Sequence, residues 1–128
     1  MNKPIRRMVY TNEHRCDLLY ADVYKGYLYF IMDYGMYPCC YIVLDKDNKY
    51  YSQDYNNIPL NVHGGLTFSS SELHGIINKD DNWIIGWDYA HYSDRVGEYY
   101  ISGHTWKTTE LIKECIKAID ELEVLCNG

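Results

Sequence analysis

Two runs of tyrosine and aliphatic residues place the tightest constraint on the fold of this chain. Residues 27–32 read YLYFIM and residues 41–44 read YIVL, and aromatic and branched side chains of this kind favour β-strands. The segment between the runs contains Asp33 and Gly35, which are turn-forming residues. Pro38 lies near the start of the second run, where its missing N–H costs least. The pattern therefore predicts an antiparallel β-hairpin.

Further strand patterns surround this hairpin. Residues 18–23, 60–62 and 66–68 are predicted as short strands, with a bend or bulge at the two glycines between the last two. Residues 83–87 (WIIGW) are apolar at successive positions, which is typical of an internal strand with both faces covered. We expect this strand to end at Asp88.

The C-terminal segment predicts one long amphipathic helix. Thr108 is a good N-cap, and Glu110 lies in the first turn, where the helix dipole favours an anion. Six apolar residues recur at helical spacing and form one stripe: Leu111, Ile112, Cys115, Ile116, Ile119 and Leu122. The predicted fold is an α+β domain, a mainly antiparallel sheet with a long C-terminal helix packed on one face, and residues 1–128 are expected to form a single domain.

Composition narrows the classes of partner and the compartment. Twelve basic and eighteen acidic residues give a net charge of −6, which disfavours broad nucleic-acid binding. No apolar run has the length of a membrane span or the pattern of a signal peptide, so we expect a cytoplasmic protein without membrane contact. The five cysteines include no C-x-x-C pair and are expected to be reduced thiols.

Residues with useful chemistry gather in two motifs, residues 63–67 (HGGLT) and residues 88–94 (DYAHYSD). The imidazoles of His63 and His91, with a carboxylate from Asp88 or Asp94, form a ligand set that suits zinc or manganese. The metal hypothesis names His63, His91 and Asp94 as the ligands. In the structural alternative, Asp88 and Asp94 cap turns while His91 hydrogen-bonds backbone carbonyls.

A second hypothesis uses the two glycines of the first motif. Their backbone N–H groups, with the Thr67 hydroxyl nearby, suit an anionic or nucleotide-like ligand, and a tyrosine or Trp87 suits stacking on a base. Gly-Gly pairs also serve bulges, so a structural role stays open. Nucleophilic catalysis is disfavoured because Cys39 and Cys40 fall in a predicted buried strand. The candidate ligand-binding residues are His63, Gly64, Gly65, Thr67, Trp87, Asp88, His91 and Asp94, and the tyrosines expected to extend them into a recognition surface are Tyr89, Tyr92, Tyr99 and Tyr100.

The two motifs also resemble those of a known family. HGGLT and W-x-x-G-x-D-x-A-H-x-x-D are similar to the marks of a family of small, mostly uncharacterised phage and prophage proteins. The resemblance extends to residues 24–27 (YKGY) and 38–42 (PCCYI). Asn56 and Asn57 depart from an acidic Y-D-D-I stretch of that family, so a cation-binding role is not carried over to them. The resemblance implies a phage or prophage origin and a shared polar cluster, without supplying a reaction.

These features favour a binding protein over an enzyme. The leading interpretation is a small phage-type protein that binds a host protein or a small anionic, nucleotide-like ligand through residues 63–94 and acts as a counter-defence factor. The alternative is a metal-dependent hydrolase of a small phosphorylated or nucleotide substrate, with Asp88 as base. No cofactor is expected under the leading interpretation, and a divalent metal ion is the cofactor that these residues would suit under the alternative. A homo-oligomeric assembly subunit is a third alternative.

Overall fold

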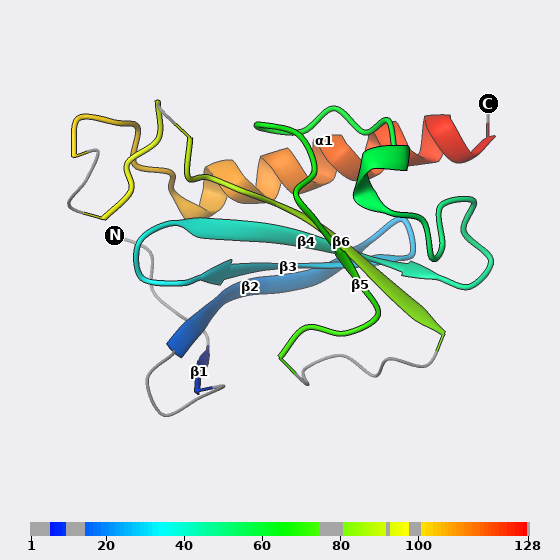
Figure 1. The fold of residues 1–128 in the computed structure, drawn as a ribbon, viewed down its shortest axis with the longest axis horizontal. Coiled ribbons are helices and arrows are strands. Elements are labelled where there is room, and N and C mark those ends of the chain that lie inside the picture. The colour runs from blue at the N-terminus through cyan, green and yellow to red at the C-terminus, as the bar shows by residue number, and fades with distance from the viewer. Residues whose placement is uncertain (1–5, 10–14, 75–80, 92, 98–100, 128) are drawn as a thin grey trace.

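The computed structural model describes residues 6–9, 15–74, 81–91, 93–97 and 101–127. It contains a six-stranded antiparallel sheet in the order β1-β2-β3-β4-β6-β5, with the helix α1 against one face (Figure 1). This confirms the predicted α+β fold. Tyr92, Tyr99 and Tyr100 lie outside the described residues. The elements are β1 (Arg6–Val9), β2 (Arg15–Tyr24), β3 (Tyr27–Asp33), β4 (Pro38–Asp45), a 3-10 helix (Tyr55–Asn57), β5 (Phe68–Ser70), β6 (Asn82–Asp88) and α1 (Thr108–Asn127).

Short turns join β2, β3 and β4. Lys25 and Gly26 form the turn between β2 and β3, and their φ angles of 50° and 82° are those that a two-residue hairpin turn requires. Residues 34–37 join β3 to β4, and Pro38 is the first residue of β4, so the predicted hairpin is confirmed. The chain then leaves the sheet after β4 and returns at β5, on the far side of β6.

Each face of the sheet carries its own apolar cluster. Cys40 on β4 packs in the cluster beneath α1, whereas its neighbour Cys39 packs in the cluster on the opposite face. Ile85 and Ile84 on β6 are divided in the same way, because successive side chains of a strand point to opposite faces. β6 pairs with β4 on one side and β5 on the other. The predicted internal strand is therefore confirmed, and its unbroken apolar sequence serves two clusters.

The helix α1 covers the sheet with the predicted stripe. Leu111, Cys115, Ile119 and Leu122 are completely buried, and burial of each aliphatic side chain stabilises the fold by about 1.5–3 kcal/mol. The carboxylate of Glu110 accepts a hydrogen bond from the backbone N–H of residue 107 at 2.9 Å, as the acidic residue of a capping box does. The cap position is thus one residue earlier than predicted. Within the described part of the chain, no helix is long and apolar enough to cross a membrane.

The segment before β5 departs from the prediction. Residues 60–62 form no strand: Leu60 is buried in the cluster beneath α1, and the N–H of Asn61 donates a hydrogen bond to Glu121 on the helix. An apolar-polar alternation does not reveal whether the buried side chains meet a sheet or a helix. Gly64 and Gly65 then turn the chain with φ angles of 69° and 81°. The next strand is β5, which begins at Phe68 and not at residue 66.

Candidate functional site

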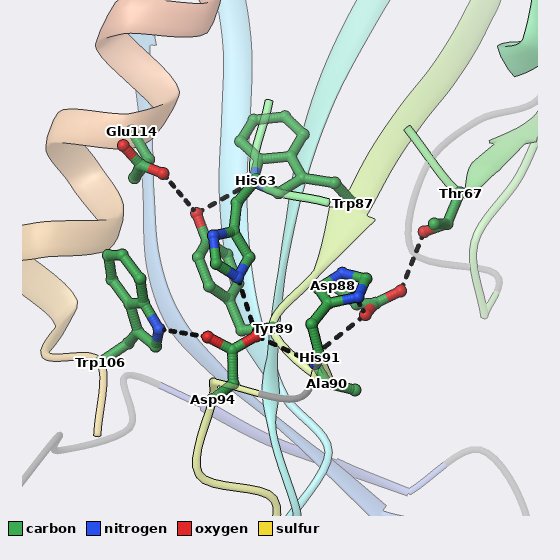
Figure 2. Close-up of polar contacts among 10 residues, drawn as sticks. All are labelled: His63, Thr67, Trp87, Asp88, Tyr89, Ala90, His91, Asp94, Trp106 and Glu114. Carbon is green, nitrogen blue, oxygen red and sulfur yellow. Dashed lines mark hydrogen bonds and ion pairs between the residues drawn. The ribbon is translucent and has the colours of Figure 1, made fainter. Parts of the chain in front are cut away.

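The two motifs meet at one end of the sheet, beside the first turns of α1 (Figure 2). His63 comes from the loop before β5, and Asp94 comes from the loop after β6. Figure 2 shows these side chains pointing toward one another, with Tyr89 behind His63 and Trp106 beside it. We call the group formed by His63, Tyr89, His91, Asp94 and Trp106 the histidine cluster.

Asp94 is the centre of the histidine cluster. Its side chain is 1% exposed, and three N–H groups donate to its carboxylate: Nε2 of His63 at 2.8 Å, the backbone N–H of His91 at 3.0 Å and Nε1 of Trp106 at 2.8 Å. Burial alone raises the pKa of Asp94, but these hydrogen bonds outweigh burial and hold the pKa below its ordinary value. Asp94 is therefore an ionised anchor. Because a carboxylate only accepts, Nε2 of His63 carries the proton that they share.

A parallel contact between two loops fixes the backbone of Asp94. The N–H of His104 donates to the carbonyl of Ser93, and the N–H of Arg95 donates to the carbonyl of His104, both at 2.9 Å. A Cβ at Gly103 would lie 2.2 Å from the carbonyl carbon of Asp94, so this approach needs a glycine. The residues after Gly103 then bring the indole of Trp106 to the carboxylate.

Aromatic rings hold His63 in place. Its imidazole stacks on the ring of Tyr89, with centroids 4.6 Å apart and 12° between the planes, and Trp106 packs against it at 5.2 Å. The hydroxyl of Tyr89 accepts a hydrogen bond from the indole N–H of Trp87 at 2.9 Å and donates one to Glu114 at 3.3 Å. Tyr89 is completely buried, so its predicted place in an exposed recognition surface is wrong. Trp87 is also buried, and it lines with His63 a small cavity beside α1.

A second chain of polar contacts surrounds His91. One oxygen of Asp88 accepts a hydrogen bond from the hydroxyl of Thr67 at 3.0 Å, and the other accepts one from the N–H of Ala90 at 3.2 Å. The second oxygen, Oδ1, also lies 3.4 Å from Nε2 of His91. That separation permits an ion pair, but it is not a hydrogen bond, and Nε2 of His91 is buried without a hydrogen-bond partner. Asp88 thus caps a turn, as the structural alternative predicts, and also faces an imidazole.

The structure gives the two glycines of the first motif different roles. A Cβ at Gly64 would lie 2.0 Å from Nε2 of His91, so the imidazole packs directly on the bare backbone of Gly64. Gly65 has open space around its Cα, and its N–H donates to the carbonyl of Val62 at 2.9 Å. Because that N–H is used to close a turn, the predicted anion site at the two glycines lacks one of its two donors.

Sequence reasoning missed several residues on which the site depends. Trp106 has a visible signal, since a tryptophan directly before a helix is well placed to pack against a neighbouring loop. Gly103 and Glu114 have no such signal, because their roles arise from loop packing and from the direction in which α1 crosses the sheet. His104, which follows Gly103, pairs with Glu110 at 2.9 Å and packs against Trp106 without touching Asp94 by its side chain.

Three of the predicted residues meet the geometric condition for a metal site. One ring nitrogen of His63, one of His91 and one carboxylate oxygen of Asp94 lie within 4.8 Å of one another. The side chains of the two histidines are 21% and 36% exposed, so solvent reaches one side of the group. Two imidazoles with one carboxylate suit zinc or manganese.

The cysteines of β4 do not have the character of nucleophiles. Burial raises the pKa of the Cys39 thiol to about 12 and raises the pKa of Cys40 well above its ordinary value. A nucleophilic cysteine needs the opposite, a lowered pKa at an accessible position. The burial and the raised pKa values of these thiols support the sequence argument against cysteine catalysis.

Comparisons with known proteins add no identity. No protein-family model matches this chain, and no curated protein or solved structure is significantly similar to it. The function is therefore inferred from the motifs and from the geometry of the histidine cluster.

Replacing Gly64 by alanine is expected to displace the imidazole of His91. The new methyl group would occupy the position of Nε2, and the imidazole is the free end of a rotatable side chain, so the ring moves before the backbone does. Moving the His91 ring from its preferred rotamer costs about 1 kcal/mol, in addition to the strain of an alanine at positive φ. Spectra of the histidine ring nitrogens would show the displacement as changed His91 shifts.

Gly65→Ala is the matched control for this substitution. Its φ is also positive, but a Cβ there meets no atom within 4 Å. Both variants should lose about 1–2 kcal/mol of unfolding free energy through backbone strain, while only Gly64→Ala should move His91. Equal changes of the His91 shifts in both variants would contradict a direct contact between Gly64 and His91.

Asp94→Asn is expected to lower the free energy of unfolding at neutral pH by about 2–3 kcal/mol, because the amide N–H₂ faces N–H donors where the carboxylate accepted. The pKa of Asp94 in the folded protein lies below its ordinary value of 3.8. The stabilisation by the ionised carboxylate of Asp94 is therefore complete above about pH 5, and it is lost as the pH falls through 3.8 toward the pKa of the folded protein. Urea unfolding of both proteins from about pH 3 to 7 measures this effect. Asp47→Asn, at an exposed carboxylate, is the control. A difference in unfolding free energy between the wild type and Asp94→Asn that does not change with pH would refute the lowered pKa of Asp94.

Proposed function

We propose that this protein is a binding protein that contacts a protein partner through the exposed edge of the histidine cluster. The observation that carries this proposal is the size of the cavity that His63 lines. It lies between the loop at residues 61–63 and α1 and has a volume of about 210 Å³, whereas sites for small organic ligands usually measure about 300–1,000 Å³. The cluster therefore suits contact with a surface better than enclosure of a nucleotide.

A larger cavity at the other end of the sheet does not favour a nucleotide either. It measures about 640 Å³ and lies near the end of α1. Lys25, one of its two lysines, is paired with Asp120 at 2.7 Å, so much of its charge is neutralised. Carboxylates outnumber lysines in the lining, which includes Asp45, Asp47, Glu123, Lys25 and Lys49. Such a lining repels phosphate groups.

The hydrogen bonding of the cluster favours binding over nucleophilic catalysis. The hydroxyl of Thr67 is directed to Asp88, and the hydroxyl of Tyr89 is directed to Glu114. Among the described residues, no hydroxyl or thiol donates a hydrogen bond to His63 or His91. A serine or cysteine mechanism needs that contact between nucleophile and base.

The proposed biological role is counter-defence in a phage or prophage. The resemblance of the two motifs to those of phage proteins supports the origin, and the net charge of −6 suits a basic surface on a host protein, including one that normally holds nucleic acid. The protein would act by occupying that surface.

Expression in bacteria that carry defined defence systems tests this role. We expect the wild-type protein to restore phage plating against at least one system and to co-purify with a component of that system. His91→Ala, at the exposed edge of the cluster, and Asp88→Ala, at the carboxylate beside His91, should lose both effects. His74→Gln is the control, because its imidazole contacts Tyr34 and not the cluster. Unchanged plating with the wild-type protein in every system, or full activity of both His91→Ala and Asp88→Ala, would refute the proposal.

A metal-dependent hydrolase of a small phosphorylated substrate is the second candidate. It is favoured by the three donor atoms within 4.8 Å and by the carboxylate of Asp88 beside His91, which is suited to the role of base. With added zinc or manganese, turnover of model phosphoesters should be lost in His91→Ala and strongly reduced in Asp88→Asn, while Asp47→Asn stays active. Absence of turnover in the metal-supplemented wild-type protein would remove this candidate.

A further inference from the structure

The partnerless nitrogen of His91 is the feature that the proposed function leaves unexplained. Nε2 is buried and makes no hydrogen bond, although Oδ1 of Asp88 lies 3.4 Å away. A buried polar atom without a partner costs about 1–3 kcal/mol, and such atoms in native proteins often mark the place of an ion or a water. If Nε2 carries a lone pair, the nearby Asp88 carboxylate repels that lone pair and increases this cost. A cation nearby would remove the cost.

We propose that His63, His91 and Asp94 bind one divalent transition-metal ion, with zinc as the representative metal. The donor atoms of these residues lie within 4.8 Å of one another and come from two loops on opposite sides of the cluster. Imidazole nitrogens favour zinc and its neighbours in the first transition row, whereas calcium and magnesium prefer sites made of oxygen alone. The inference goes beyond partner binding and does not depend on it.

The surroundings of the three donors are those of a supported metal site. The indole of Trp106 donates to Oδ1 of Asp94, which leaves Oδ2 on the side of the imidazoles. Asp88 is held by the hydroxyl of Thr67 and faces the imidazole of His91. Because this contact is to Nε2, the nitrogen without a hydrogen bond, Asp88 would be a further carboxylate beside the ion and not a partner of the opposite ring nitrogen. These outer contacts fix the donors before an ion arrives.

Metal binding requires small movements of both imidazoles, because Nε2 of His91 packs against the backbone of Gly64 and His63 is hydrogen-bonded to Asp94. Nε2 of His63 and Oδ2 of Asp94 are 2.8 Å apart, which is a hydrogen-bond distance, whereas two ligands of a tetrahedral zinc ion are about 3.3 Å apart. The ion would replace the shared proton and separate the two atoms by about 0.5 Å. His63 is on a loop and its side chain is partly exposed, so a shift of this size is small. Three protein ligands leave a coordination position for water or for a donor from a partner.

Titration of the metal-free protein tests the site. The protein is stripped with a chelator, dialysed and titrated with zinc in competition with a chromophoric chelator, and cobalt is used to report coordination by its visible absorption. We expect one equivalent of zinc and a cobalt spectrum with nitrogen and oxygen ligands. His63→Ala and His91→Ala should each lower the affinity by at least about 100-fold, while His74→Gln keeps it. Magnesium and calcium at the same concentrations should not compete.

A separate measurement decides the matter if a variant fails to fold. In the wild-type protein, zinc should shift the ring resonances of His63 and His91 and leave those of His74 in place. Failure to bind one equivalent of zinc, or zinc binding that leaves both cluster histidines unshifted, would overturn the proposal. Either result leaves the partner-binding test unaffected, because plating and co-purification are measured without added metal.

Discussion

The architecture of the site depends on one buried carboxylate. Asp94 accepts N–H groups from His63, from the backbone of His91 and from Trp106, so three separate segments of the chain converge on it. A buried carboxylate deprived of such donors costs several kcal/mol. The loop before β5, the loop after β6 and the segment leading to α1 therefore stabilise one another, and the site forms as a unit.

Aromatic packing connects this unit to the core. His63 rests on Tyr89, and the hydroxyl of Tyr89 links Trp87 on β6 to Glu114 on α1. Moving the imidazole far from its position would disturb side chains that hold sheet and helix together. The cost of ordering His63 is thus met during folding, so the ring is already oriented for the proposed partner or ion.

Periodicity predicted the sheet and the helix because both signals are local. The strand patterns of β3, β4 and β6 and the stripe of α1 each depend on the spacing of apolar residues within a few turns or strand lengths. The predictions that failed depend on contacts with elements that are distant in the sequence. Residues 60–62 alternate like a strand, yet Leu60 is buried in the cluster beneath α1 and Asn61 donates a hydrogen bond to Glu121 on the helix. Tyr89 looks like part of an exposed motif and is buried, since only the tertiary position of α1 places a helix over it.

The spacing of the motifs follows from the register of the sheet. β5 and β6 are antiparallel, with Phe68 opposite Gly86. Beyond the ends of these strands, contacts between the two motifs continue in the same antiparallel order. Moving back along the first motif and forward along the second, the successive contacts are Thr67 with Asp88, Gly64 with His91, and His63 with Asp94.

This continued register explains why two short motifs so far apart in sequence carry one site. Each contact needs a different property: a hydroxyl at Thr67, a missing side chain at Gly64 and an imidazole at His63. Inserting one residue in either motif would shift the partners that lie beyond the insertion. Packing alone accounts for Gly64 and for the buried carboxylate of Asp94. It leaves Nε2 of the partly exposed His91 buried without a hydrogen bond, and the proposed metal ion would give this nitrogen a partner.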